Sequence, residues 1–192
     1  MRIIGIDCAT DDTKVGVAWA LRTSQGVRVM DACVCTRAQS ALDRVAKCAS
    51  EAEGQVLIAI DAPLGWPRPM GDALVGHRAG AEVLVSPNDL FRRATDRYIQ
   101  RRLGKTPLDV GADRIARTAH AALRLLGGLR ARLPHEIPLA WMSPPGEMVS
   151  AIEVYPAATL LSHGIRAKGY KKPGQVAERR EIVAALARSL VL

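Results

Sequence analysis

Apolar runs near the N-terminus have the length and spacing of β-strands. Residues 2–6 form a short apolar stretch that ends at Asp7. Two further segments with strand-like composition, 13–22 and 27–36, are separated by a short turn at 24–26. Because a tight turn joins consecutive strands only when they run antiparallel, the pattern predicts a three-stranded antiparallel meander at the start of the chain.

A capped helix and a wholly apolar strand follow the meander. Ser40 stands at the N-cap position and Asp43 at the capping-box position, and the helical pattern continues to about Gly54. Residues 56–60 are apolar at every position, which is typical of a strand covered on both faces. A strand reached through a helix normally lies parallel to its neighbour, so we expect residues 56–60 to pair with residues 2–6.

The second half of the chain has a mainly helical pattern. Ser86 and Pro87 form a strong helix start, whereas residues 70–84 are ambiguous between a weak helix and a loop. The elements predicted here are helices over 86–103 and 113–132, a strand over 151–155, a short helix from 156 and a last helix from about 175 to the end. With 192 residues, the chain suits one domain, carrying a helical insertion at about 66–147.

Composition narrows the cellular setting and the partners. No stretch is apolar enough to act as a signal peptide or membrane span, and the four cysteines lack zinc-site spacing, so we expect a cytoplasmic protein with reduced thiols. The 27 Lys and Arg outweigh 19 Asp and Glu, a net charge of +8. This balance favours a polyanionic partner, although an Arg-rich composition inherited from a GC-rich genome would look the same.

The two apolar strands end in the same way, with Asp7 after one and Asp61 after the other. If the strands are parallel neighbours, both carboxylates emerge at one edge of the sheet, where strands lie about 4.8 Å apart. Carboxylates this close repel unless a cation lies between them, and oxygen ligands suit Mg²⁺ or Mn²⁺. Each Asp alone could simply cap a turn; the matched pair favours a metal site.

The order of several short motifs resembles the family called domain of unknown function 429, whose members are predicted ribonuclease H-like nucleases. The motifs span almost the whole chain and comprise residues 5–7, 60–65, 93–96, 153–156 and 170–172. The resemblance implies an α/β, ribonuclease H-like fold with helices on both faces of a five-stranded mixed sheet ordered 3-2-1-4-5. It also implies metal-binding acids on the first and fourth strands, but no substrate.

Further acids are needed if the site is to hold two metals. Glu153, on the predicted fifth strand, is the candidate third catalytic and metal-binding acid, or else a strand residue on a solvated face. Proteins of this superfamily usually place another acid on a late helix. Here that helix offers Glu178 and Glu181, so either one of them serves or the acid is missing.

The densest basic segment offers a surface for phosphates. Arg93, Arg97 and Arg101 follow one another at intervals of four, which would form one stripe on a continuous helix. Lys171 and Lys172 add positive charge near the end of the chain. These five residues are the predicted nucleic-acid contacts; the alternative for the arginines is a solvated helix face.

Three functions fit these patterns. The first is a metal-dependent nuclease that hydrolyses phosphodiester bonds in nucleic acid, with Asp7, Asp61 and Glu153 around Mg²⁺ or Mn²⁺. The second is a relative of the sugar kinases and actin-like ATPases, although that class normally needs two such domains. The third is a nucleic-acid-binding module without catalysis. The number of acids that converge at the sheet edge discriminates, since four favour the nuclease and two the binding module.

Overall fold

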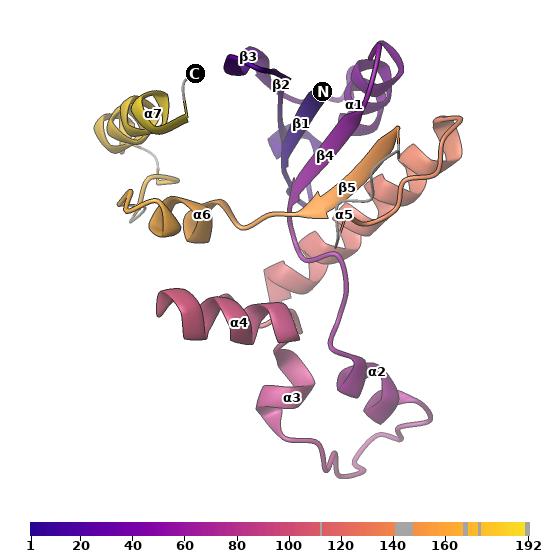
Figure 1. The fold of residues 1–192 in the computed structure, drawn as a ribbon. Helices are drawn as coiled ribbons and strands as arrows, with labels where there is room; N and C mark the ends of the chain where they lie inside the picture. The colour runs from indigo at the N-terminus through magenta and orange to yellow at the C-terminus, as the bar shows by residue number, and fades with distance from the viewer. Residues whose placement is uncertain (112, 141–147, 167–168, 173, 191–192) are drawn as a thin grey trace.

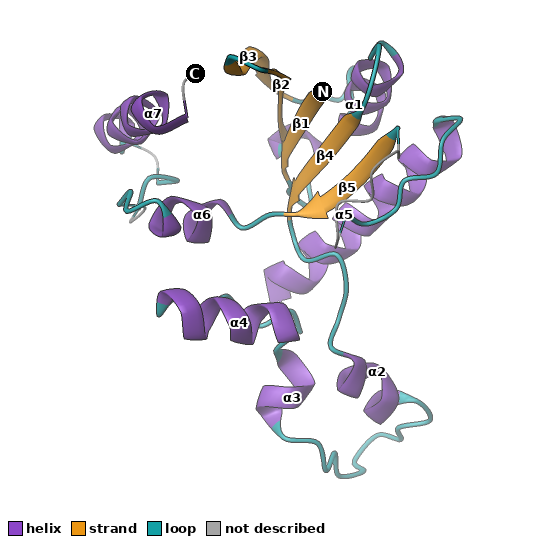
Figure 2. Ribbon diagram, in the orientation of Figure 1, coloured by secondary structure: helices purple, strands orange, loops and turns teal. Residues whose placement is uncertain are grey.

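The computed structural model describes residues 1–111, 113–140, 148–166, 169–172 and 174–190 (Figure 1). Within these residues the chain folds into an α/β structure, in which three strands come first and four helices in succession separate the fourth strand from the fifth (Figure 2). The strands are β1 (Arg2–Asp7), β2 (Gly16–Thr23), β3 (Gly26–Val34), β4 (Val56–Asp61) and β5 (Val149–Glu153). The helices are α1 (Ala41–Ser50), α2 (Arg68–Leu74), α3 (Pro87–Phe91), α4 (Ala94–Leu103), α5 (Asp113–Arg132), α6 (Pro156–Ser162) and α7 (Val176–Leu190).

The five strands form one mixed sheet in the order β3-β2-β1-β4-β5. β2 pairs antiparallel with both β1 and β3, whereas β4 pairs parallel with both β1 and β5. The predicted meander, the parallel pairing of residues 2–6 with 56–60 and the strand order are therefore confirmed. The crossover through α1 brings β4 beside β1, as expected for a parallel connection.

One face of the sheet carries the main core. Ile4 lies opposite Ile58, and Ile6 opposite Ile60, and all four side chains are buried. α1 and α5 cover this face, where Val45 and Leu126, among others, join the same cluster. The alternate strand positions are only half-buried, so β4 is less completely covered than its apolar sequence indicates. α6 and α7 instead bury Leu160, Ile165 and Ile182 in a small cluster of their own.

The predicted helix over 86–103 is wrong as one continuous element. Arg92 and Arg93 have extended backbones and separate α3 from α4. Arg93 instead caps α4, because its backbone N–H donates to the carboxylate of Asp96 at 2.9 Å. The helix then ends at Gly104, whose φ of 64° is easily adopted by glycine. Consequently Arg93 does not share a helical stripe with Arg97 and Arg101.

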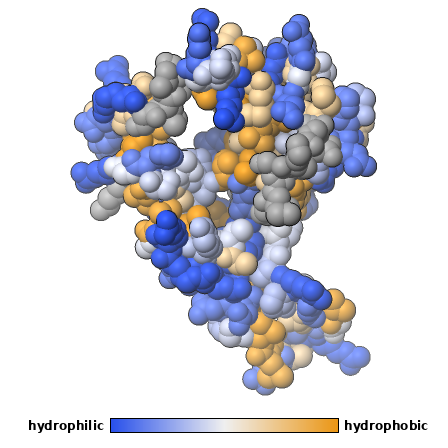
Figure 3. All heavy atoms as spheres, viewed as in Figure 1, coloured by the Kyte–Doolittle hydropathy of each residue, from blue (hydrophilic) through white to orange (hydrophobic). Residues whose placement is uncertain are grey.

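The chain between β4 and β5 extends well away from the sheet before α5 returns to pack against α1. In Figure 1, α2 and α3 form the far end of this excursion. Apolar side chains reach the surface of the molecule there (Figure 3), and the exposed residues of this part of the chain include Leu74, Val75 and Leu84. None of the helices within the described ranges combines the length and hydropathy that crossing a membrane requires.

Candidate functional site

The strand register brings the two predicted acids face to face. Asp7 is the last residue of β1, Asp61 the last residue of β4, and the two are direct partners in the parallel ladder. Both carboxylates thus stand at the carboxyl edge of the sheet, where ligands of open α/β sheets bind. The Asp7 side chain is 62% exposed and the Asp61 side chain 19%. Asp61 therefore forms the floor of the site, and Asp7 its rim.

A lysine from a distant part of the chain lies between these acids. The Nζ of Lys171, in the segment between α6 and α7, donates to Asp7 Oδ1 at 3.1 Å and to Asp61 Oδ2 at 2.9 Å. Partial burial lowers the pKa of Lys171, but its hydrogen bonds and attraction to both acids outweigh this and raise that pKa above its ordinary value. Burial raises the pKa of Asp61, and Lys171 opposes that shift. The acid pair thus accommodates one cationic group between its two carboxylates.

Cys8 follows Asp7 and lines the same cavity. Burial, reinforced by the negative charges of Asp61 and Asp7, raises the pKa of its thiol to about 12. A thiol with this pKa is protonated at neutral pH, and the thiolate is the form that attacks electrophiles and ligates metals. In this environment the Cys8 side chain is therefore a neutral thiol.

Glu153 is held by an arginine and not by the acid pair. Arg93 donates through Nη1 to Glu153 Oε2 at 2.7 Å and through Nη2 to Oε1 at 2.8 Å. The backbone N–H of Leu64 also donates to Oε2, at 2.9 Å. The structure therefore brings this predicted third acid together with Arg93. Within the described ranges, no three Asp, Glu, His or Cys side chains gather closely enough to hold one metal ion.

The same arginine also binds Asp96, which completes a buried ion cluster. Arg93 Nη2 donates to Asp96 Oδ1 at 2.8 Å, and Asp96 is only 5% exposed. Burial lowers the pKa of Arg93, but the hydrogen bonds to Asp96 and Glu153 outweigh it and raise that pKa above its ordinary value. The cluster ties the start of α4 to the end of β5 and, through Leu64, to the loop after Asp61.

The five predicted phosphate contacts occupy three different environments. Arg93 is used in the ion cluster, and Arg97 pairs with Asp89 at 3.2 Å. Arg101 lines a cavity and makes no ion pair with any described residue. Lys171 and Lys172 line the cavity that contains the acid pair. Among these five residues, positive charge without an acidic partner in the described part of the chain therefore lies in two places, Arg101 on α4 and Lys172 beside the acid pair.

Glu178 and Glu181, the late-helix candidates, lie on α7. In the described part of the chain, no hydrogen bond or ion pair links either of them to Asp7, Asp61 or Lys171. α7 packs instead against α6 and Tyr170 through apolar side chains. The structure thus brings together two of the predicted acids, with a lysine between them.

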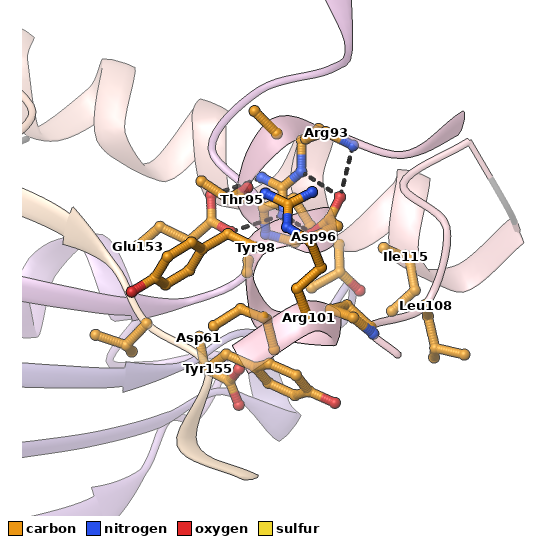
Figure 4. Close-up of a pocket in the computed structure, with 17 residues that line it drawn as sticks. Asp61, Arg93, Thr95, Asp96, Tyr98, Arg101, Leu108, Ile115, Glu153 and Tyr155 are labelled. Atoms are coloured by element: carbon orange, nitrogen blue, oxygen red, sulfur yellow. Dashed lines mark hydrogen bonds and ion pairs between the residues drawn. The ribbon is translucent and has the colours of Figure 1, made fainter. Parts of the chain in front are cut away.

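Two adjoining cavities open beside the acid pair. The first, of about 390 Å³, is lined by Asp7, Asp61, Lys171 and neighbouring residues. The second, of about 650 Å³, lies between the end of the sheet and helices α4 and α5 (Figure 4). Asp61 and Tyr155 belong to both linings. The sequence analysis gave no role to Tyr155 or to the bridging position of Lys171, although the motifs over residues 153–156 and 170–172 contain these two residues.

Comparisons with known proteins identify a family but no activity. No curated protein matches the chain. Among solved structures, the one titled Thermus thermophilus RuvC structure is similar, with 14% sequence identity, 69% of this chain and 96% of that chain covered, and a TM-score of 0.21. A TM-score this low does not establish a shared fold, so the fold assignment rests on the sheet topology. The family model described as protein of unknown function (DUF429) matches residues 5–191, and the chain therefore belongs to this family.

Proposed function

We propose that this protein is a metal-dependent phosphodiesterase of the ribonuclease H type that acts on nucleic acid. The observation that carries the proposal is the direct opposition of Asp7 and Asp61 at the carboxyl edge of two parallel strands. Two carboxylates in this position need a cation, and Lys171 already shows that a cationic group fits between them. The net charge of +8 is consistent with a polyanionic substrate.

The residues present fit a hard divalent cation. Mg²⁺ is commonly bound through one or two carboxylates, with water and substrate phosphate completing its coordination. Asp7 and Asp61 supply such a pair, and they would exchange the ammonium of Lys171 for Mg²⁺ or Mn²⁺. When bound, the metal supplies a Lewis acid and an activated water. The Lys171 side chain is 55% exposed, so its ammonium can move outward to a substrate phosphate.

Glu153 serves this site as a positioning residue. Its carboxylate is held by Arg93 and accepts the N–H of Leu64, three residues after Asp61. The pairing fixes the loop that leaves β4 and so fixes the approach to the Asp61 side chain. For Glu153 to act as a third metal ligand, its carboxylate would first have to leave Arg93, whose charge would then lack a partner in a mostly buried place.

A second function, a nucleic-acid-binding module without catalysis, is favoured by the number of converging acids. Two acids meet at the described sheet edge, where four would favour a nuclease. Both functions use the same basic residues around the same cavity. They differ in whether bound nucleic acid is cleaved when the metal is supplied.

The test is a cleavage assay with Mn²⁺ or Mg²⁺ on single-stranded and double-stranded DNA and RNA. We expect the wild type to cut at least one of these polymers and Asp61→Asn to lose the activity. Asp31→Asn is the matched control, because Asp31 is an exposed acid on β3, away from the carboxyl edge. Binding of all four polymers without cleavage would establish the binding module instead.

A further inference from the structure

The larger cavity beside the acid pair has a strongly apolar wall. Tyr98, Leu108, Ile115 and Tyr155 line it, together with the aliphatic parts of neighbouring residues (Figure 4). Tyr98 is 58% exposed and Leu108 71% exposed, so large apolar groups face solvent at its mouth. Its volume of about 650 Å³ is within the range of small-molecule sites in proteins. The size and the two aromatic rings indicate a site for a flat, largely apolar group.

The charged residues around the cavity indicate what kind of ligand could carry this flat apolar group. At one end, the single cation Arg93 is paired with two carboxylates, Asp96 and Glu153, so this end of the cavity does not attract an anion. Arg101 lines the cavity and is free of ion pairs within the described chain, so its guanidinium is available to an anion. Guanidinium groups bind phosphate well. The ligand therefore combines a flat apolar part with a phosphate.

The position of the cavity connects it with the acid pair. Asp61, Ile115, Thr118 and Tyr155 line both cavities, so a ligand in the larger one adjoins Asp61 and reaches toward Lys171. A chain whose backbone phosphate lies at the acid pair can place its next base between the tyrosines. Only an unstacked base has a free face for this, whereas the bases of a duplex are stacked on one another.

We infer that the larger cavity binds one unstacked nucleobase of a single-stranded nucleic acid, with Tyr98 and Tyr155 against the base and Arg101 on a neighbouring phosphate. The inference rests on the proposed function only in taking the ligand to be a nucleic acid. It names the substrate class, single-stranded segments or free ends, and it assigns Tyr98 and Arg101 to substrate binding independently of any metal.

The experiment measures equilibrium binding of the full chain to four fluorescent probes at one salt concentration, in EDTA so that nothing is cleaved. The probes are a single-stranded 12-mer DNA, its RNA equivalent, the DNA duplex of the same sequence and a 12-mer of abasic nucleotides. The abasic probe keeps every phosphate but has no bases. We expect both single strands to bind more tightly than the duplex, and the abasic strand to bind at least about tenfold more weakly than the normal strand, since stacking on an aromatic side chain contributes about 1–3 kcal/mol per base.

Matched variants locate the effect on the protein. Tyr98→Ala should weaken binding of the single strand about tenfold, whereas Tyr98→Phe, which keeps the ring, should bind as the wild type does. Arg101→Ala should weaken binding more than Arg102→Ala, although each removes one exposed charge from neighbouring positions of α4, because Arg102 does not line the cavity. The three positions changed in these four variants carry exposed or largely exposed side chains on α4, and a thermal melt of each variant shows whether it is folded.

Equal binding of abasic and normal strands, or a duplex that binds as tightly as the single strand, overturns the inference, because contacts to phosphate alone then explain the affinity. Wild-type affinity of Tyr98→Ala overturns it as well. Its failure is distinguishable from failure of the proposed function. If the protein cleaves nucleic acid but its binding does not depend on the bases, the phosphodiesterase proposal stands and the base site is wrong. If binding depends on the bases but no cleavage occurs in Mn²⁺, the base site stands and the phosphodiesterase proposal is wrong.

Discussion

Two groups of acids, each with a cationic partner, lie at the same end of the sheet. They differ in how easily the cationic partner can be replaced. Lys171 bridges Asp7 and Asp61 with one ammonium shared by two carboxylates, and the lysine and Asp7 side chains are more than half exposed. Arg93 binds Glu153 and Asp96 in a mostly buried setting, with nearly all of its donors used. An exposed pair is worth little to stability and can exchange its cation, whereas a buried one is costly to break. The more exposed group around Lys171 is thus suited to exchange its cation for a ligand, whereas the buried group around Arg93 stabilises the fold.

The largest effect should come from removing the cation of the buried cluster. Arg93→Met leaves Glu153 and Asp96 without their partner, which should lower the free energy of unfolding by about 3–5 kcal/mol. Arg97→Met is the control, since its pair with Asp89 is more exposed and should be worth at most about 1 kcal/mol. Urea denaturation of both variants measures the difference. A similar decrease in the free energy of unfolding of both variants would mean that the buried cluster stabilises the protein no more than the exposed pair does.

Glu153→Gln distinguishes a positioning residue from a metal ligand. The change keeps the size of the side chain but removes the charge bound by Arg93, so we expect about 1.5–3 kcal/mol lower stability. The stabilisation that Mn²⁺ gives should persist in this variant, because Asp7 and Asp61 are intact. Thermal melts with and without Mn²⁺ measure both effects. Loss of the Mn²⁺ effect at unchanged stability would make Glu153 a ligand after all.

Lys171→Met should have opposite effects on stability and on metal binding. The lysine side chain is more than half exposed, so the loss of its ion pairs should cost the metal-free protein about 1 kcal/mol, and the repulsion then left between Asp7 and Asp61 adds to this cost. Without the competing ammonium, Mn²⁺ should bind severalfold more tightly. Lys172→Met is the control, because Lys172 lines the same cavity but does not bridge the acids. Calorimetric titration with Mn²⁺ gives the affinities; weaker binding in Lys171→Met would show that the lysine supports the metal.

The smallest effect concerns an exposed ion pair outside both groups, which joins α1 to α5. The pKa of Asp43 is lowered by the hydrogen bonds from Ser40 and then by those from Arg132. A carboxyl whose pKa is lowered on folding contributes stability above its unfolded pKa and loses it as the pH falls through the folded value. Asp43→Asn should therefore be less stable than the wild type at neutral pH, and the free energies of unfolding of the two proteins should converge in acid. Urea denaturation at pH 7 and at pH values well below 3.8, the ordinary pKa of the carboxyl, tests this, and an unchanged difference in the free energy of unfolding at the lowest pH would contradict it.

The strands could be predicted because their information is local. Apolar runs, a tight turn and a helical crossover fixed the meander and the place of β4 beside β1, and the register then set Asp7 opposite Asp61. The cap of α1 at Ser40 was equally local, although the helix ends at Ser50, before Gly54.

Contacts between distant residues could not be predicted in the same way. Ser86 and Pro87 start a helix as expected, yet the chain leaves it at Arg92 and Arg93. Nothing in the local pattern marks this break, because the partner that holds Arg93 is Glu153, 60 residues later. Lys171 is likewise 164 residues from Asp7. Its place as a bridge depends on how the chain returns after α6, which hydrophobic periodicity does not specify.

The central claim is that Asp7 and Asp61 form the metal site, and a thermal melt in Mn²⁺ tests it most directly. Mn²⁺ should raise the melting temperature of the wild type, corresponding to about 2.7 kcal/mol at a concentration 100 times its Kd. The metal-free Asp7→Asn variant should be about as stable as the wild type, because carboxylate repulsion is relieved while Lys171 still pairs with Asp61. Its melting temperature should not respond to Mn²⁺, whereas the Asp31→Asn control should respond as the wild type does. Equal Mn²⁺ shifts in the wild type and Asp7→Asn would place the metal elsewhere and contradict the account.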